Sequence, residues 1–295
     1  MNRTPYRAGS FYEADPAACR RSAQALVDEA VLPPDLPPAP VGGLVPHAGW
    51  VFSGKTAALT FKALAAGGRL EHVILLGSDH WGVSPAAAVY DQGAWQTPLG
   101  DLPVDEQLAA ALLKECPVLR AQPQAHAREH SIEVQLPILQ VLSPQARIVP
   151  ISVPPGAQSA EIGRVIGLAV KRLAAARPAW AKVGVVGSTD LTHYGLQYGF
   201  TPGGTGRTGL DWARDNDRRI LKLIETMQAE RIVPECSARR NACGGGAIAA
   251  TIAACAALGA ARGLCLEYVT SADVMDRVYH QRADDAVGYA AVVFA

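Results

Sequence analysis

The stretch HVILLGSDHWG (residues 72–82) is the strongest indication of the fold, because it joins a continuous apolar run to a short polar loop. Apolar residues without alternation are typical of a strand that is covered on both faces of a sheet. Runs of the same kind occur along the whole chain, each ending in glycine or a polar loop. The five predicted strands are Val41–Val45, His72–Leu76, Arg147–Val153, Val183–Val186 and Gly288–Phe294.

Helical patterns lie between the predicted strands. Apolar residues recur at helical spacing over Ile162–Leu173, with Ser159 placed to cap the start, and again over Ile220–Met227 and Leu108–Leu112. Strands that alternate with helices predict an α/β fold with a central, largely parallel or mixed sheet flanked by helices.

Two segments rich in proline or glycine are predicted loops. VLPPDLPPAP (residues 31–40) would join an N-terminal helix to the first core strand, and TPGGTGRTG (residues 201–209) would follow the fourth strand. Only 30 residues precede the first of them, so it is not read as a linker between domains. The chain also shows no repeat of 20–50 residues. A single domain over residues 1–295 is therefore predicted.

The composition argues against several classes of protein. The 27 Lys and Arg residues balance 27 Asp and Glu residues, so the chain has no overall attraction to nucleic acid. The long uncharged stretch at residues 242–261 is mostly Ala and Gly, which favours a buried helix over a membrane span. The beginning lacks an apolar signal segment, and the six cysteines include no Cys-x-x-Cys pair. A cytoplasmic protein with reduced thiols, without nucleic-acid or membrane binding, is predicted.

Three histidines lie at or just past the ends of predicted strands: His47, His80 and His193. LLGSDHWG (residues 75–82) and VVGSTDLTHYG (residues 185–195) share the order strand, Gly-Ser, Asp, His, Gly. One such copy is explained by a turn that caps the next helix. Two copies, together with a third histidine at a strand end, favour a ligand site, because open α/β sheets bind ligands beyond the carboxyl ends of their strands.

A metal ion would unite these imidazoles, and such a site normally adds a carboxylate or a thiolate. Asp79 and Asp190 are the nearby carboxylates. Cys243 precedes three glycines and the Ala-rich helix, and a helix N-terminus favours the thiolate form of a cysteine. The alternative is that Cys243 is a small buried residue that packs the start of this helix. Cys255 and Cys265 are assigned only such packing.

The segment HAREHSIEVQLPILQ (residues 126–140) combines polar and apolar residues in two conflicting patterns. The polar residues interleave with apolar ones, which is typical of a strand, and they are Glu129, His130, Glu133 and Gln135. In contrast, Ser131 as a cap and Pro137 as a kink would suit a helix. The two periods leave its secondary structure open. The remaining histidines, His72, His126 and His280, are expected to be structural.

A series of motifs resembles those of the Memo family, whose bacterial and archaeal members are called AmmeMemoRadiSam system protein B. The motifs occur in the family's order and cover nearly the whole chain. They are RAGSFYEADP (7–16), VPHAGWVFSG (45–54), GSDHWG (77–82), EHSIEVQLPIL (129–139), STDLTHYG (188–195), CGGGAIAA (243–250) and VGYAAVVF (287–294).

The resemblance implies a fold similar to that of LigB-type class III extradiol dioxygenases, which hold non-haem iron with two histidines and a carboxylate. It implies that His47 and His80 are metal ligands and that Cys243 takes the third place. His193 would then match the general base, His130 would be a second imidazole of the pocket, and Asp190 a neighbouring carboxylate.

The sequence departs from the family's pattern at three positions. Asp79 and Trp81 stand where many members have Ser and a second His, and Ala247 stands where a Pro is usual. His80 is therefore the single candidate ligand of its loop, and Asp79 is placed to hydrogen-bond a ligand imidazole instead.

Two functions are consistent with these features. The first is a metal-dependent oxidoreductase of the dioxygenase type that binds a divalent or cuprous ion, with iron expected and copper or zinc as alternatives because a thiolate is a soft ligand. The second is a non-catalytic adaptor that binds a metal or a peptide in the same crevice. A zinc hydrolase is a weaker third option. The family's grouping name also implies AMMECR1-like and radical-SAM proteins as partners, in addition to a small-molecule or peptide ligand.

Overall fold

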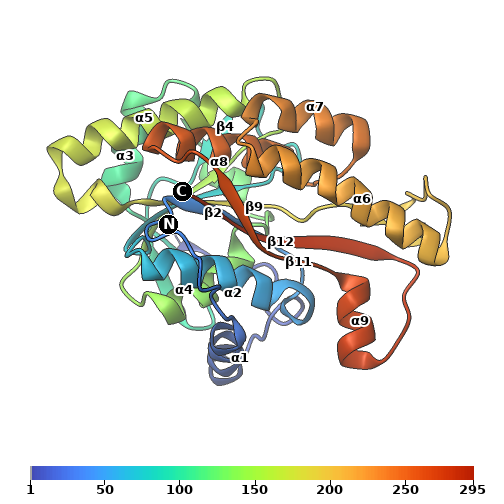
Figure 1. Ribbon diagram of the computed structural model, residues 1–295. Coiled ribbons are helices and arrows are strands. Elements are labelled where there is room, and N and C mark those ends of the chain that lie inside the picture. Colours follow the sequence, from blue (N-terminus) through green and yellow to red (C-terminus); the bar gives the residue numbers. More distant parts are fainter. Residues whose placement is uncertain (1) are drawn as a thin grey trace.

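A nine-stranded mixed sheet forms the centre of the computed structural model, which describes residues 2–295 (Figure 1). In spatial order its strands are β10 (His193–Tyr194), β12 (Ala286–Phe294), β2 (Gly42–Val45), β9 (Gly184–Ser188), β3 (His72–Gly77), β8 (Arg147–Ser152), β4 (Ala87–Val89) and β7 (Leu119–Ala121), with β11 (Gly263–Thr270) paired to β12. The four central strands β2, β9, β3 and β8 are parallel, whereas β12 runs antiparallel to β2, β10 and β11. All five predicted strands are present, and the α/β class with a mixed sheet is confirmed.

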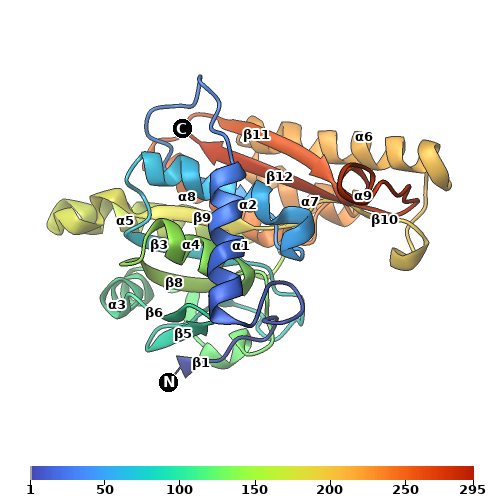
Figure 2. The same cartoon turned by 90° about the horizontal axis from the view of Figure 1, so that it is seen from below.

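Helices cover both faces of this sheet. They are α1 (Pro16–Glu29), α2 (Trp50–Ala66), α3 (Glu106–Glu115), α4 (Leu136–Leu142), α5 (Ser159–Ala176), α6 (Gly206–Glu225), α7 (Ala229–Arg239), α8 (Gly245–Leu258) and α9 (Ser271–Tyr279). Figures 1 and 2 show α5, α6, α7 and α8 on one side and α1, α2 and α4 on the other. Short 3-10 turns are η1 (Pro123–His126), η2 (Glu133–Gln135), η3 (Pro178–Lys182) and η4 (Leu196–Tyr198). A small second sheet has the order β1 (Asn2–Arg3), β5 (Ala94–Thr97) and β6 (Gly100–Pro103).

The Ala-rich helix α8 is buried between α5 and the sheet, as its composition predicts. Small residues let the two helix backbones approach closely: a Cβ added to Gly163 of α5 would lie 1.9 Å from the carbonyl oxygen of Ala250 in α8. Within residues 2–295, no helix is both long and apolar enough to cross a bilayer.

Three local expectations are corrected. Ser159 is the first residue of α5 and does not cap it; its hydroxyl donates to the carbonyls of Pro154 and Gly156. The predicted loop at residues 201–209 ends early, because α6 begins at Gly206. The helical pattern predicted to extend to Met227 is shorter in the structure, because α6 ends at Glu225 and Met227 has a positive φ of 57°.

The ambiguous segment at residues 126–140 contains no strand. It forms η2 and then α4, and Pro137 lies in the first turn of α4, where a missing N–H costs no hydrogen bond. Ser131 caps no helix; its hydroxyl accepts a hydrogen bond from the Ser78 N–H at the end of β3. Tertiary contacts therefore determine the conformation of this segment.

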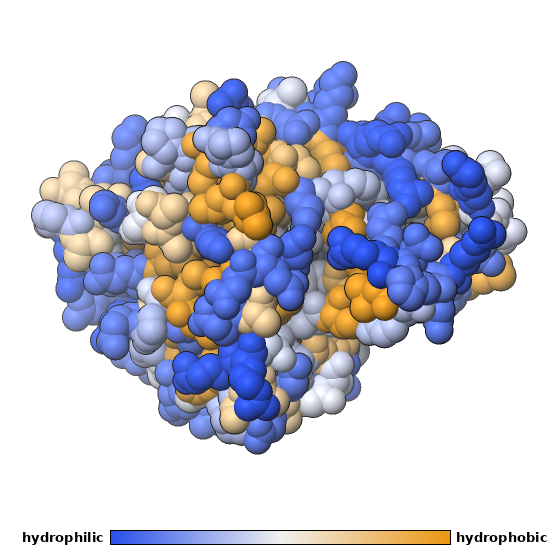
Figure 3. Space-filling view, turned by 60° about the horizontal axis from the view of Figure 1, so that its bottom comes forward, coloured by the Kyte–Doolittle hydropathy of each residue, from blue (hydrophilic) through white to orange (hydrophobic). Residues whose placement is uncertain are grey.

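One hydrophobic core runs from α1 to β12, and it includes Phe61, Ile74, Ile148 and Phe294. The surface turned forward in Figure 3 shows apolar patches separated by hydrophilic residues. Large apolar side chains that remain exposed include Val51, Trp81, Val83 and Leu196.

Candidate metal centre and its cavity

Segments far apart in the sequence meet at one edge of the central sheet. His47 follows β2, His80 follows β3 and Asp190 follows β9, and these three strands are parallel, so their carboxyl ends share this edge. Cys243 precedes α8, and His130 precedes η2. Most of the site residues predicted from the sequence therefore lie close together.

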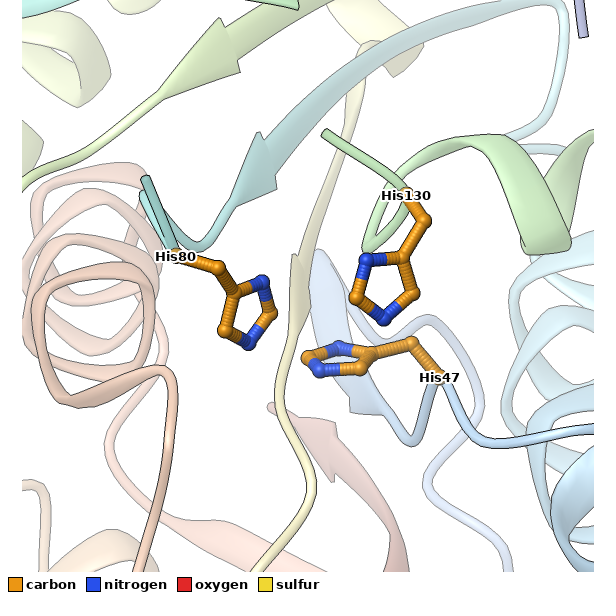
Figure 4. A group of neighbouring side chains, drawn as sticks. All are labelled: His47, His80 and His130. Atoms are coloured by element: carbon orange, nitrogen blue, oxygen red, sulfur yellow. The ribbon is translucent and has the colours of Figure 1, made fainter. Parts of the chain in front are cut away.

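Three imidazoles form the centre of the site, as Figure 4 shows. One ligand nitrogen from each of His47, His80 and His130 lies within 4.8 Å of the other two, an arrangement able to hold a metal ion. The ring centroids are 5.1 Å apart for His47 and His80, 5.4 Å for His47 and His130, and 4.9 Å for His80 and His130.

The Cys243 thiol lies beside this cluster, with Sγ 3.2 Å from Nε2 of His47. The Asp190 N–H donates to Sγ at 3.3 Å. Burial raises the pKa of Cys243, but His47 and a hydrogen bond with His80 outweigh burial and lower this pKa to about 6. The lowered pKa favours the thiolate, and the neighbouring imidazoles His47 and His80 are its cause.

The Nδ1 atom of His47 is held by Ser188 at the end of β9. The distance from Nδ1 to Ser188 Oγ is 2.9 Å, and Ser188 donates its own proton to the carbonyl oxygen of Ser131 at 2.7 Å. Because that proton is committed, Ser188 accepts from Nδ1–H, and Nε2 is the ring nitrogen of His47 that faces Cys243.

Glu129 fixes His80 in a similar way. Its carboxylate accepts from the His80 N–H at 2.9 Å and lies 3.0 Å from His80 Nδ1. It also accepts from the N–H groups of His130 and Ser131. Burial lowers the pKa of His80, but hydrogen bonds with Cys243 and Glu129 outweigh burial and raise it to about 10. The pKa of Glu129 is held well below its usual range by His80 and these N–H donors, despite burial.

His130 is the neutral imidazole of the cluster. Burial and the neighbouring His47 and His80 lower its pKa to about 3. Its Nδ1 is buried and has no hydrogen-bond partner among residues 2–295. The ring packs edge-on against Phe11 from the N-terminal segment, with centroids 5.3 Å apart.

Asp190 and His193 complete the polar set. The buried Asp190 carboxylate accepts from the His47 N–H at 2.7 Å, and burial raises its pKa. His193, at the start of β10, places Nδ1 3.1 Å from the carbonyl oxygen of Leu191. A carbonyl only accepts, so Nδ1 carries the proton and Nε2 keeps its lone pair.

A cavity of about 1000 Å³ opens above these groups. Its wall includes His47, His80, His130, Asp190 and His193, together with Phe11, Tyr198, Tyr289, Asp284 and Asp285. This volume lies in the range of small-molecule sites.

The donor set fits a small metal ion. Donors around a tetrahedral ion with bond lengths of about 2.0–2.3 Å lie about 3.3–3.7 Å apart, so the 3.2 Å between Cys243 Sγ and His47 Nε2 requires little adjustment. The polar partners of His47 and His80 leave Nε2 as the metal-facing atom, as is usual for histidine ligands. The group with ligand atoms close enough to share an ion is His47, His80 and His130. Cys243 is a further donor beside it, in contact with His47 and hydrogen-bonded to His80.

The contacts of several residues at the site were not predicted from the sequence. Asp79 was expected to hold a ligand imidazole, but it accepts from the Val83 N–H within its own turn, and Glu129 holds His80 instead. Phe11 and Ser188 lie inside quoted motifs, yet nothing in their spacing indicated a contact across the sheet. His72 pairs with Asp105, and the buried His126 contacts the carbonyl oxygen of Ala88, so neither joins the cluster.

Comparison with known proteins identifies the family. A model of Memo-like proteins matches residues 3–293. A MEMO1 family protein of Methanopyrus kandleri is 39% identical over 303 residues, which cover 100% of this chain and 99% of the relative. A MEMO1 family protein of Methanothermobacter thermautotrophicus is 35% identical, over 98% of this chain and 99% of the relative. An uncharacterized protein of Escherichia coli K12 aligns structurally with a TM-score of 0.44 and 14% identity, over 76% of this chain and 86% of that chain. The family match and both relatives extend over nearly the whole sequence, and the chain therefore belongs to the Memo-like family.

Proposed function

We propose that this protein binds one divalent or cuprous metal ion through His47, His80 and Cys243, and that it is a metal-dependent oxidoreductase acting on a small molecule in the cavity. One observation carries the proposal: two oriented imidazoles line an open cavity, and a thiol with a lowered pKa lies 3.2 Å from the Nε2 atom of one of them, His47. The soft thiolate supports Cys243 over His130 as the third ligand. Iron is the expected metal, and copper or zinc would also suit this set.

The metal would supply chemistry that the side chains lack. When bound, iron or copper would supply redox chemistry with O₂ as the co-substrate, and zinc would supply Lewis acidity. The protein would fix the direction of the ligand lone pairs through Ser188 and Glu129 and would keep the cavity side of the ion open.

His193 is the proposed general base. Its Nε2 lone pair can take a proton from a hydroxyl of a ligand in the cavity, because Nδ1–H is committed to Leu191. Asp190 would act as a positioning residue through the His47 N–H. His130, neutral near pH 7, would be a second imidazole available to the ligand.

Metal content and turnover test the two parts of the proposal separately. Protein purified without oxygen should hold about one Fe, Cu or Zn per chain. His47→Ala and Cys243→Ala should lose the metal, whereas His130→Ala and His193→Ala should retain it. Retention by Cys243→Ala with loss by His130→Ala would overturn the proposed ligand set.

Oxygen uptake with a panel of catechols and related phenols tests the activity. We expect uptake by the native protein and none by His193→Ala with its metal still bound. Metal binding without uptake across the panel would contradict the oxidoreductase and favour the adaptor role. AMMECR1-like and radical-SAM partners remain predictions of the family resemblance, to be tested by co-purification.

A further inference from the structure

A second cavity, of about 430 Å³, lies at the edge of the sheet opposite the metal centre. Its wall includes His72, Asp105, Glu106, Arg147, Arg177 and Trp180. His72 is the first residue of β3 and Arg147 the first residue of β8, and the two pair in register across the sheet. The metal centre lies beyond the other end of β3, and no described residue lines both cavities.

Two arginines in this wall have no acidic partner. The guanidinium groups of Arg147 and Arg177 form no ion pair and no hydrogen bond within residues 2–295. Arg177 instead lies over the Trp180 ring, 4.6 Å from its centroid, and this contact holds it at the wall. Arg164 and Arg172 of α5, by contrast, each form an ion pair with a glutamate. Guanidinium groups with free N–H donors are suited to binding the oxygens of an anion.

The two carboxylates of the wall are already engaged in hydrogen bonds. One oxygen of Asp105 lies 2.6 Å from His72 Nδ1, and the other accepts from the Leu108 N–H at 3.0 Å. Glu106 accepts from the Gly93 N–H through Oε1 at 2.8 Å. The two arginines and the two carboxylates balance in formal charge, so the groups that remain free determine which ligand fits.

Two ring nitrogens of the wall also lack a partner in the part of the chain that the structure describes. A carboxylate only accepts, so His72 donates through Nδ1–H to Asp105 and Nε2 is its free nitrogen. Trp180 is only 6% exposed, and its indole N–H, which can only donate, is bonded to no other described residue. A nearly buried N–H without a partner is costly, which favours an acceptor in the cavity.

The free groups of the cavity are therefore mainly donors: two guanidinium groups and one indole N–H, against a single free carboxylate oxygen, Oε2 of Glu106. A phosphate monoester matches them, because at pH 7 it carries about two negative charges and three acceptor oxygens. The cavity is larger than the space that one phosphate ion fills, and its volume lies in the range of small-molecule sites.

We infer that this cavity binds a phosphate group, a function separate from the proposed metal-dependent reaction. Arg147 and Arg177 would hold the phosphate oxygens, and the Trp180 N–H and the His72 ring would complete the site. The volume favours a small phosphate monoester over free phosphate as the source of this group.

Titrations followed by phosphorus NMR test the inference on the metal-free full chain at pH 7 and low salt. Without a metal ion, phosphate cannot bind at the other edge of the sheet as a metal ligand. We expect glycerol phosphate and inorganic phosphate both to bind, and the tighter of the two identifies the source. Acetate, a monoanion with two acceptor oxygens, should compete at least about tenfold more weakly. Competition by acetate as strong as that by phosphate would overturn the inference.

Arginine variants locate the binding. Arg147→Gln and Arg177→Gln should each weaken the binding of glycerol phosphate about fivefold to tenfold, and the double variant at least about thirtyfold. Arg231→Gln removes the same charge at an exposed position of α7 outside this cavity, and it should bind like the native protein. Trp180→Phe, which keeps an aromatic ring and removes the N–H, should weaken binding about threefold or more.

The contradicting results are equally specific. Binding that survives the double variant would place the phosphate elsewhere on the protein. An equal loss in Arg231→Gln would show attraction by net charge alone. Either result, or no binding of both phosphates by the native protein at millimolar concentration, would overturn the inference.

Discussion

Glu129 is a single side chain on which the geometry of the cluster depends. Its carboxylate serves four donors at once: Nδ1 and N–H of His80 and the N–H groups of His130 and Ser131. All four groups donate hydrogen bonds. A glutamine at this position would replace one carboxylate oxygen with an NH₂ group, which is itself a donor and cannot accept from at least one of them.

Glu129→Gln should therefore weaken metal binding about 10-fold to 100-fold, the usual effect of losing a partner of a histidine ligand. A competition titration with a chelator of known affinity measures the change. Glu115→Gln, which alters only an exposed ion pair with Arg172, is the control. Unchanged metal affinity in a folded Glu129→Gln protein would show that Glu129 does not orient His80.

Cys243 differs from the other five cysteines. Burial raises the pKa of Cys19, Cys116, Cys236, Cys255 and Cys265, whereas the pKa of Cys243 is lowered to about 6. At pH 7 iodoacetamide should thus modify metal-free protein first at Cys243, because the thiolate is the nucleophile.

Saturating zinc should slow this alkylation at least about tenfold, since a coordinated thiolate is shielded from the reagent. Peptide mass spectrometry identifies the modified cysteine. An unchanged rate in zinc-loaded protein would argue against Cys243 as a ligand.

At the scale of elements, the packing of α5 on α8 depends on glycine. Gly163→Ala would push a methyl group into the carbonyl oxygen of Ala250, and the helices must separate. We expect a loss of about 1–3 kcal/mol in the free energy of unfolding, the usual cost of overpacking. Gly156→Ala is the matched control, because nothing lies within 4 Å of its added Cβ. Urea unfolding compares the two, and equal stabilities would contradict the close approach.

An element can be predicted from the sequence when its own residues determine its conformation, and it cannot when residues far away in the sequence do. The apolar runs of β2, β3, β8 and β9 carry their own signal, because a strand covered on both faces is apolar throughout. Because His47 and His80 directly follow two of these apolar runs, their position at the same edge of the sheet could also be predicted. The segment at residues 126–140 carries no such signal, because the buried Glu133 in it is held by Arg3, Tyr6 and Tyr12 of the N-terminal segment, more than 100 residues away in the sequence. The contact of Glu129 with His80 could not be predicted either, because these two residues are 49 positions apart in the sequence.

At the scale of the whole molecule, the buried Asp217 links stability to pH. It accepts from the Thr192 N–H and the Tyr268 hydroxyl, and burial raises its pKa to about 7 despite these hydrogen bonds. The folded protein thus binds a proton that the unfolded chain has released between about pH 4 and pH 7.

Stability should consequently fall as the pH rises through this window, with Asp217 contributing on the order of 2–4 kcal/mol. Asp217→Asn should flatten that part of the profile, while Asp35→Asn should reproduce the native slope. Urea unfolding at pH 5, 6, 7 and 8 measures the slopes. Parallel profiles for Asp217→Asn and native protein would contradict the raised pKa.

The central claim is that His47, His80 and Cys243 share one metal ion. An anomalous-scattering map of a crystal grown with the metal tests ligands and element together. We predict one peak per chain, at about 2.0–2.3 Å from Nε2 of both histidines and Sγ of Cys243. A peak bonded to His130 but not to Cys243, or no peak at this edge of the sheet at saturating metal, would contradict it.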